Sequence, residues 1–167
     1  MKTLVVYESG YGNTERIARA VAEALHEQGE ARVAPVGGIE QPRPGEVDLL
    51  VVGAPTQRHG LPGAARDFLE QIPKGALSGM RALAFDTRYR GLRLVRGSAA
   101  HNIAGLLRAL GCRLLASPES FFVKGEEGPL EPGEEYRARA WALRALGRPE
   151  HGNPGAFAPR DHPGGGQ

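Results

Sequence analysis

Short apolar runs alternate with amphipathic stretches along this chain, and this alternation limits the fold more than any other feature. Residues 2–7 (KTLVVY) form a β-branched apolar run that ends at Gly-rich sequence. Residues 14–28 then place Ile17, Val21 and Leu25 at helical spacing, and Gly29 follows. A continuous apolar run is typical of a buried strand, and Gly commonly ends a helix. The pattern predicts a strand, a loop and a helix, in that order.

The same alternation continues to the end of the apolar sequence. Further strands are predicted at residues 31–36, 49–53 and 81–85, and a fifth, broken around Pro118, at 114–123. Further helices are predicted at residues 62–72, 98–110 (with Ser98 as the N-cap) and 134–146. Parallel strands need crossover connections, and right-handed crossovers can place helices on either side of a sheet. We therefore expect a doubly wound α/β fold, with five parallel strands and helices on both faces.

The last twenty residues differ in composition from the rest. In residues 148–167, Gly and Pro recur throughout, and Phe157 is the only large apolar side chain. Such a segment buries too little surface to offset the entropy of ordering it. We expect a domain over residues 1–147 and a flexible C-terminal tail over 148–167. Two His residues in the tail, His151 and His162, lack the spacing of metal ligands.

Composition excludes several classes of protein. Lys and Arg number 21 and Asp and Glu 19, which leaves a formal charge of +2, too small to indicate a nucleic-acid partner. A single cysteine excludes an internal disulfide. There is no charged-then-apolar leader and no run of 18 apolar residues, so we expect a cytoplasmic protein without membrane insertion. Cys112 and Trp141 are expected in the core.

The loop after the first strand has the character of an anion site. In open α/β sheets, ligands bind beyond the carboxyl ends of the strands. Glycine permits positive φ, and the start of a helix adds unpaired N–H groups and a favourable dipole. The expected phosphate-binding residues are Ser9, Gly10, Tyr11, Gly12, Asn13 and Thr14. The alternative is an ordinary strand-to-helix turn in which Asn or Thr only caps the helix.

Other ligand classes fail on particular residues. A P-loop requires Lys before its Ser or Thr, and the dinucleotide fingerprint requires a third glycine where this chain has Glu15 or Arg16. Phospho-receiver domains need an acidic side chain where the third strand ends, but this chain has Gly53-Ala54-Pro55. No Cys or His cluster has metal-ligand spacing. Triphosphate, NAD, phosphoryl transfer and metal binding are all disfavoured.

Three loops taken together resemble those of the flavodoxin family. Residues 9–14 (SGYGNT) are similar to the family loop that holds the phosphate of FMN, and residues 53–60 (GAPTQRHG) match the loop that flanks one face of the flavin ring. Residues 86–89 (DTRY) are similar to the family segment Asp-Ser-Ser-Tyr, whose Tyr stacks on the other face. The resemblance covers residues 2–147 and implies the strand order 2-1-3-4-5.

This resemblance implies a noncovalent FMN site and a redox function. The residues that it assigns to the ring are Pro55, Thr56, Gln57, Arg58, His59, Gly60, Asp86, Thr87, Arg88 and Tyr89. The implied function is electron transfer between a reductase or NAD(P)H and an acceptor. Two alternatives remain open: an FMN-dependent quinone or protoporphyrinogen oxidoreductase, and a flavin-free interaction module on the same fold.

Two loops depart from the family pattern. The second loop has Gln57, Arg58 and His59 where flavodoxins often carry an aromatic residue. The third loop is basic where familiar flavodoxins are acidic, and its arginines are Arg88, Arg90, Arg93 and Arg96. Cations near the ring favour the reduced anion, so our hypothesis is a two-electron potential higher than that of acidic flavodoxins. The same arginines are also compatible with an acidic partner protein, the phosphates of NADPH or simple solvation.

Overall fold

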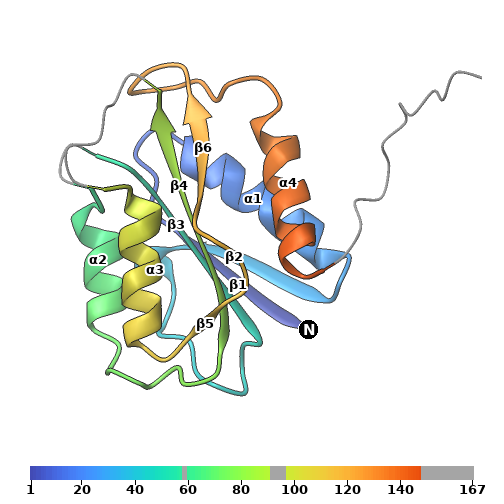
Figure 1. Cartoon of the computed structure of the whole chain (residues 1–167), viewed down its shortest axis with the longest axis vertical. Coiled ribbons are helices and arrows are strands. Elements are labelled where there is room, and N and C mark those ends of the chain that lie inside the picture. Colours follow the sequence, from blue (N-terminus) through green and yellow to red (C-terminus); the bar gives the residue numbers. More distant parts are fainter. Residues whose placement is uncertain (58–59, 91–96, 148–167) are drawn as a thin grey trace, which may run out of the picture.

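A single parallel sheet with helices on both faces organises the protein (Figure 1). The computed structural model describes residues 1–57, 60–90 and 97–147. In chain order, the elements are β1 (Lys2–Tyr7), α1 (Asn13–His26), β2 (Glu30–Pro35), the 3₁₀ helix η1 (Val36–Gly38), β3 (Leu49–Pro55), α2 (Gly63–Glu70), β4 (Arg81–Tyr89), α3 (Ala99–Ala109), β5 (Arg113–Leu114), β6 (Glu119–Val123) and α4 (Glu134–Ala145). The predicted tail, residues 148–167, lies outside the described residues.

The sheet has the order β2-β1-β3-β4-β5, and β6 also pairs with β4. Each of these pairings is parallel, and Val5 of β1, for example, lies between Val33 of β2 and Val51 of β3. β5 and β6 are two parts of the fifth position, separated by a break that includes Pro118, as predicted. The doubly wound fold class and its strand order are confirmed.

One boundary prediction was wrong in a way that matters for the site. The fourth strand, predicted to end at residue 85, continues to Tyr89. Its last residues pair on both sides, Thr87 with Pro55 of β3 and Tyr89 with Val123 of β6. These pairings come from distant segments, so the local polar sequence of residues 86–89 does not indicate them. The segment that we expected as a loop is therefore the rigid end of a central strand.

Two hydrophobic cores lie on opposite faces of the sheet. Alternate side chains of β1 divide between them, so that Leu4 and Val6 pack under α2 and α3 while Val5 and Tyr7 pack under α1 and α4. Figure 1 shows this arrangement, with the sheet between the two pairs of helices. Central strands buried on both faces explain why residues 2–7 are continuously apolar.

Both side chains predicted to be core residues are buried. Trp141 of α4 packs edge-to-face against Phe85 and Phe121, with ring centroids 6.3 and 5.8 Å away. Cys112 lies in the core under α2 and α3, where burial raises the pKa of its thiol to about 11. A thiol with so high a pKa stays protonated near neutral pH, which makes it a poor nucleophile.

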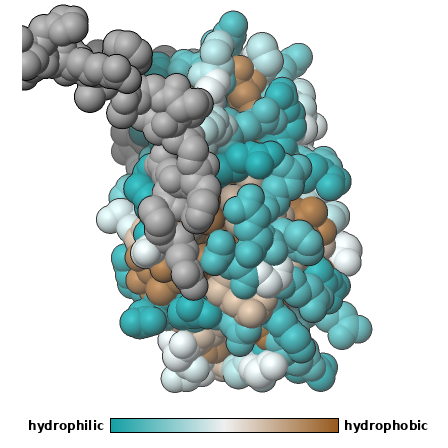
Figure 2. Space-filling view, turned by 90° about the vertical axis from the view of Figure 1, so that its right-hand side faces the viewer, coloured by the Kyte–Doolittle hydropathy of each residue, from teal (hydrophilic) through white to brown (hydrophobic). Residues whose placement is uncertain are grey.

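The face of the molecule around α4 is mainly hydrophilic (Figure 2). Figure 2 views the molecule from the α4 side and shows hydrophobic residues only in small separate groups. Among the described residues, Tyr11 and Tyr136 are the large hydrophobic side chains that are exposed. None of the described helices is both long and apolar enough to cross a membrane.

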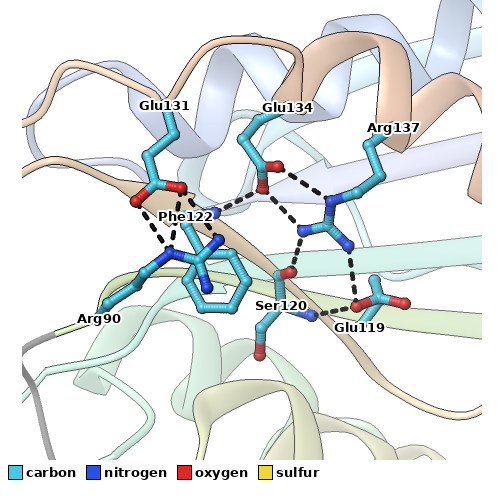
Figure 3. A network of polar contacts seen from close by, with 7 residues as sticks. All are labelled: Arg90, Glu119, Ser120, Phe122, Glu131, Glu134 and Arg137. Carbon is cyan, nitrogen blue, oxygen red and sulfur yellow. Dashed lines mark hydrogen bonds and ion pairs between the residues drawn. The ribbon is translucent and has the colours of Figure 1, made fainter.

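An ionic network ties α4 to β6 (Figure 3). The buried carboxylate of Glu134 accepts hydrogen bonds from the Phe122 amide at 2.7 Å and from Arg137 Nε at 2.9 Å. Arg137 also reaches Glu119, at 3.1 Å. Burial alone would raise the pKa of Glu134, but the hydrogen bonds from Arg137 and Phe122 and the charges of Arg137 and Arg90 outweigh it, so this pKa is lowered.

We expect Glu134→Gln to lower the free energy of unfolding at pH 7 by about 1–3 kcal/mol, because it removes a charged acceptor from a buried site. A lowered pKa means that the unfolded state binds the proton more readily, so the stability from Glu134 is present above about pH 4.3 and is lost on acidification. The variant should therefore show a shallower loss of stability below about pH 5. Urea unfolding across pH tests this.

The matched control for that experiment is Glu135→Gln. Glu135 forms an exposed pair with Arg16 at 2.8 Å, and exposed pairs contribute about 1 kcal/mol or less. If Glu134→Gln left the acid limb of the stability curve as steep as in the wild-type protein, the role assigned to this network would be wrong.

Candidate functional site

The carboxyl ends of β1, β3 and β4 surround a cavity of about 490 Å³. All three predicted loops contribute to its wall. The lining residues are Ser9, Gly10, Tyr11, Asn13, Thr14, Pro55, Thr56, Gln57, Thr87, Arg88, Tyr89, Val123 and Glu126. The structure thus brings most of the predicted residues together. Gly12, Gly60 and Asp86 do not line the cavity, and Arg58 and His59 lie outside the described residues.

The start of α1 is an uncapped helix N-terminus at this cavity. Gly12 is the N-cap residue, has φ of 88°, and provides no side chain to accept a hydrogen bond. Its own amide donates to Ser9 Oγ at 3.0 Å, which folds the loop back on itself. The first amides of a helix have no acceptor within the helix, so those at the start of α1 are available to an anion. A positive φ at this point is what makes glycine necessary.

In contrast, α3 begins at the same edge of the sheet with its amides occupied. Its first three amides donate to side-chain oxygens, from Ala99 to Thr56 at 2.9 Å, from Ala100 to Asp86 at 3.1 Å and from His101 to Ser98 at 3.2 Å. Ser98 is thus the N-cap predicted from the sequence. One amide in the first turn of α2 also has a side-chain acceptor, because the Ala65 amide donates to the Glu8 carboxylate at 2.8 Å. Of these three helices, α1 is the one whose N-terminus lacks a side-chain partner.

Asp86 holds the scaffold together below the cavity. It is fully buried, and its Oδ2 accepts hydrogen bonds from Thr56 Oγ1 at 2.7 Å and from the Ala100 amide. Its other oxygen, Oδ1, has no hydrogen-bond partner in the part of the chain that the structure describes. Asp86 therefore joins β3, β4 and α3. The resemblance implies a cofactor contact for Asp86; in the structure its side chain is buried behind the cavity wall and bonds to Thr56 and to the start of α3.

A second polar contact joins the first loop to the end of β4. The hydroxyls of Thr14 and Thr87, both buried, lie 2.7 Å apart. Either oxygen can donate this hydrogen bond, and both residues line the cavity. The adjacent Tyr89 is partly buried in the same wall. The spacing between the first and third loops is thereby set by side chains as well as by strand pairing.

A fourth loop, which we did not predict as part of the site, completes the wall. Val123 and Glu126 line the cavity, and the Glu127 carbonyl accepts a hydrogen bond from Asn13 Nδ2 at 3.1 Å. Gly128 allows this contact, because a Cβ there would lie 2.6 Å from the Asn13 amide group. The sequence could have predicted this fourth loop. The last strand of a parallel sheet also ends at this edge, and residues 124–128 (KGEEG) follow it.

Arg88 and Glu126 are the only charged side chains among the described lining residues. Arg88 Nε is buried without a hydrogen-bond partner in the described chain, and its guanidinium lies 5.5 Å from the Phe122 ring. Arg90 lies outside the cavity and forms a two-pronged pair with Glu131, with Nε and Nη2 at 3.0 and 3.1 Å (Figure 3). The two arginines thus have different surroundings. Arg93 and Arg96, predicted with them, lie outside the described residues.

A second hollow lies beside α2. It measures about 680 Å³ and lies between residues 36–44 and α2, with Phe68 and Ile72 in its wall. It contains none of the motifs singled out in the sequence. Across residues 1–57, 60–90 and 97–147, no group of three or more His, Cys, Asp or Glu side chains is placed to hold a metal ion.

Comparison with known families identifies the domain. A sequence model of the flavodoxin domain matches residues 4–91, more than half of the chain. The chain belongs to the flavodoxin family. The matched segment runs from β1 to the end of β4 and so includes the first three loops of the site.

Solved flavodoxin structures share the fold. Flavodoxin 2 from Bacillus cereus has a TM-score of 0.75 at 21% identity and covers 88% of this chain and 99% of its own. A short-chain flavodoxin associated with a non-canonical PDU bacterial microcompartment has a TM-score of 0.74 at 18% identity, covering 88% and 97%. A flavodoxin from Streptococcus pneumonia TIGR4 has a TM-score of 0.72 at 20% identity, covering 88% and 99%. The search of curated proteins found no match to this chain.

For the scaffold below the cavity, we expect Asp86→Ala to lower the free energy of unfolding by about 2–4 kcal/mol, because Thr56 and Ala100 lose a buried acceptor. Asp86→Asn retains a carbonyl acceptor for both donors, so its loss should be smaller than that of Asp86→Ala. Urea unfolding of both variants tests this, and equal losses would show that an acceptor at this position is not what stabilises the fold.

Proposed function

We propose that this flavodoxin binds one FMN noncovalently in the cavity at the carboxyl edge of the sheet and transfers electrons between a donor and an acceptor. One observation carries the proposal above all others: the uncapped N-terminus of α1 opens on this cavity, while Thr56, Asp86 and Ser98 cap α3 next to it. The first amides of α1 therefore lack side-chain acceptors, and a ligand that brings its own acceptors, such as a phosphate, can supply them.

The phosphate of FMN would lie at the first loop. The amides of Asn13 and Thr14, at the start of α1, and the helix dipole favour a dianion there, and the Ser9 and Thr14 hydroxyls supply further donors. No acidic side chain of the first loop lines the cavity, which leaves Glu126 of the fourth loop as the acidic group in its wall. These residues fit a phosphate monoester.

The flavin ring would lie between the second loop and the end of β4. Pro55, Thr56 and Gln57 form one side, and Tyr89 offers an aromatic plate on the other. The cavity volume of about 490 Å³ is within the range usual for small-molecule sites, about 300–1,000 Å³. When bound, FMN supplies the redox chemistry, and the protein orients the ring and adjusts its electrostatic surroundings.

The FMN proposal predicts a strong preference for the phosphate group. Calorimetric titration of the full chain should give binding of FMN at least about tenfold tighter than riboflavin, because one good charge-assisted site contributes more than about 1.4 kcal/mol. If the protein binds neither compound at micromolar concentration, it is a flavin-free module and the proposal fails.

A pair of glycine substitutions localises the binding. Gly12 and Gly133 are both N-cap residues with similar φ, 88° and 84°, and open space lies around each. Alanine at either position introduces similar backbone strain of about 1 kcal/mol. We expect Gly12→Ala to weaken FMN binding about tenfold or more and Gly133→Ala to leave it unchanged. Equal effects of the two variants would place the phosphate elsewhere.

A turnover assay distinguishes an electron carrier from an oxidoreductase. A carrier needs a separate reductase, so we expect the FMN-loaded protein alone to oxidise NADH or NADPH with a quinone no faster than the same concentration of free FMN. A quinone-dependent rate well above that of free FMN would identify the protein as an FMN-dependent quinone oxidoreductase instead.

A further inference from the structure

We propose that Arg88 is the side chain that raises the two-electron potential of the bound flavin, and that Arg90 has no part in it. This inference rests on the proposed FMN site. The sequence presents the arginines of this segment as one basic cluster. In the structure, Arg88 and Arg90 differ in position: Arg88 lines the cavity and Arg90 does not.

Arg88 is an uncompensated cation in the cavity wall. It lies between Thr87 and Tyr89 at the end of β4, and its Nε is buried without an acceptor. Among the described residues it has no ion pair. Its guanidinium lies 5.5 Å from the centre of the Phe122 ring, whose face attracts cations weakly. A buried N–H without a partner is unfavourable until an acceptor arrives. The carbonyl and nitrogen edge of a flavin ring provides such acceptors.

Arg90, in contrast, is neutralised and exposed. Its side chain is 64% exposed, both carboxylate oxygens of Glu131 accept its hydrogen bonds, and its guanidinium stacks 3.9 Å from the centre of the Phe122 ring (Figure 3). Solvent screens an exposed pair of this kind. The field of Arg90 at the cavity is therefore small, although its sequence position is only two residues from Arg88.

The acidic side chain in the cavity wall does not pair with Arg88. Glu126 comes from the fourth loop, whose next residue, Glu127, accepts the hydrogen bond from Asn13 in the first loop. The carboxylate of Glu126 forms no ion pair with Arg88 in the described chain. Arg88 therefore remains a cation in the cavity wall without an ion-pair partner among the described residues.

An unbalanced cation changes the redox equilibrium in one direction. When the ring takes up two electrons and one proton, it gains one negative charge. A nearby guanidinium stabilises this anion more than the neutral oxidised ring, so the reduced cofactor binds more tightly than it would without Arg88. Tighter binding of the reduced form is equivalent to a higher two-electron midpoint potential.

The test compares the full-length wild-type protein with Arg88→Gln, Arg88→Met, Arg88→Lys and Arg90→Gln. Each is loaded with FMN and titrated anaerobically at pH 7 with dithionite, which supplies the electrons, against a reference dye. Fluorescence quenching gives the dissociation constant of oxidised FMN for each variant. Potential and dissociation constant together give the affinity of the reduced form.

We expect Arg88→Gln and Arg88→Met to lower the ratio of reduced to oxidised affinity about tenfold, which corresponds to a potential about 30 mV lower. Arg88→Lys should retain most of the wild-type potential because it retains the charge. Arg90→Gln should leave the potential unchanged. The methionine variant keeps an apolar stem of similar length, so a folding defect in one neutral variant does not remove the test.

Three results would overturn the inference. Equal shifts for the Arg88 and Arg90 variants would mean a general effect of surface charge. An unchanged potential in both neutral Arg88 variants would mean that Arg88 has no electrostatic effect on the flavin ring. A loss of oxidised and reduced affinity by the same factor would make Arg88 a binding residue only. In each case FMN still binds, whereas failure of the proposed function itself appears as wild-type protein that binds no FMN.

Discussion

Parallel pairing of β1, β3 and β4 is the constraint on which the site depends, because strands that run in one direction must end at one edge of the sheet. Buried hydrogen bonds then set the spacing of the segments beyond that edge. A hydrogen bond between Thr14 and Thr87 joins the start of α1 to the end of β4. A second, from Thr56 to Asp86, joins the residue after β3 to β4. The cavity wall is therefore formed by strand ends and the start of α1 together with the loops that these contacts position.

What the cavity can bind depends on which hydrogen-bond donors around it already have acceptors within the protein. The amides of α3 are occupied by side chains, and Arg90 is occupied by Glu131. The start of α1 and the Nε of Arg88 have no such partners in the described residues. Donors left without acceptors in the wall of one cavity are consistent with the proposed ligand, which carries both a phosphate and a ring with hydrogen-bond acceptors.

Sequence reasoning predicted what depends on local periodicity and missed what depends on distant contacts. The strands, the helices, their order and the cap at Ser98 follow from apolar spacing and from residue types at helix ends. The buried role of Asp86 depends on where α3 begins, and the neutralisation of Arg90 depends on a residue 41 positions away. The contribution of Glu126 likewise requires the fourth loop to fold back onto Asn13. Such pairings leave no periodic signal in the chain.

The central claim is that the amides at the start of α1 hold the phosphate of the cofactor. The most direct measurement is the amide ¹H–¹⁵N NMR spectrum of the full chain with and without FMN. We predict that the largest downfield shifts of amide protons occur at Asn13 and Thr14, where new charge-assisted hydrogen bonds form. Largest shifts around Phe68 and Ile72, in the hollow beside α2, or no shifts at Asn13 and Thr14, would contradict the account.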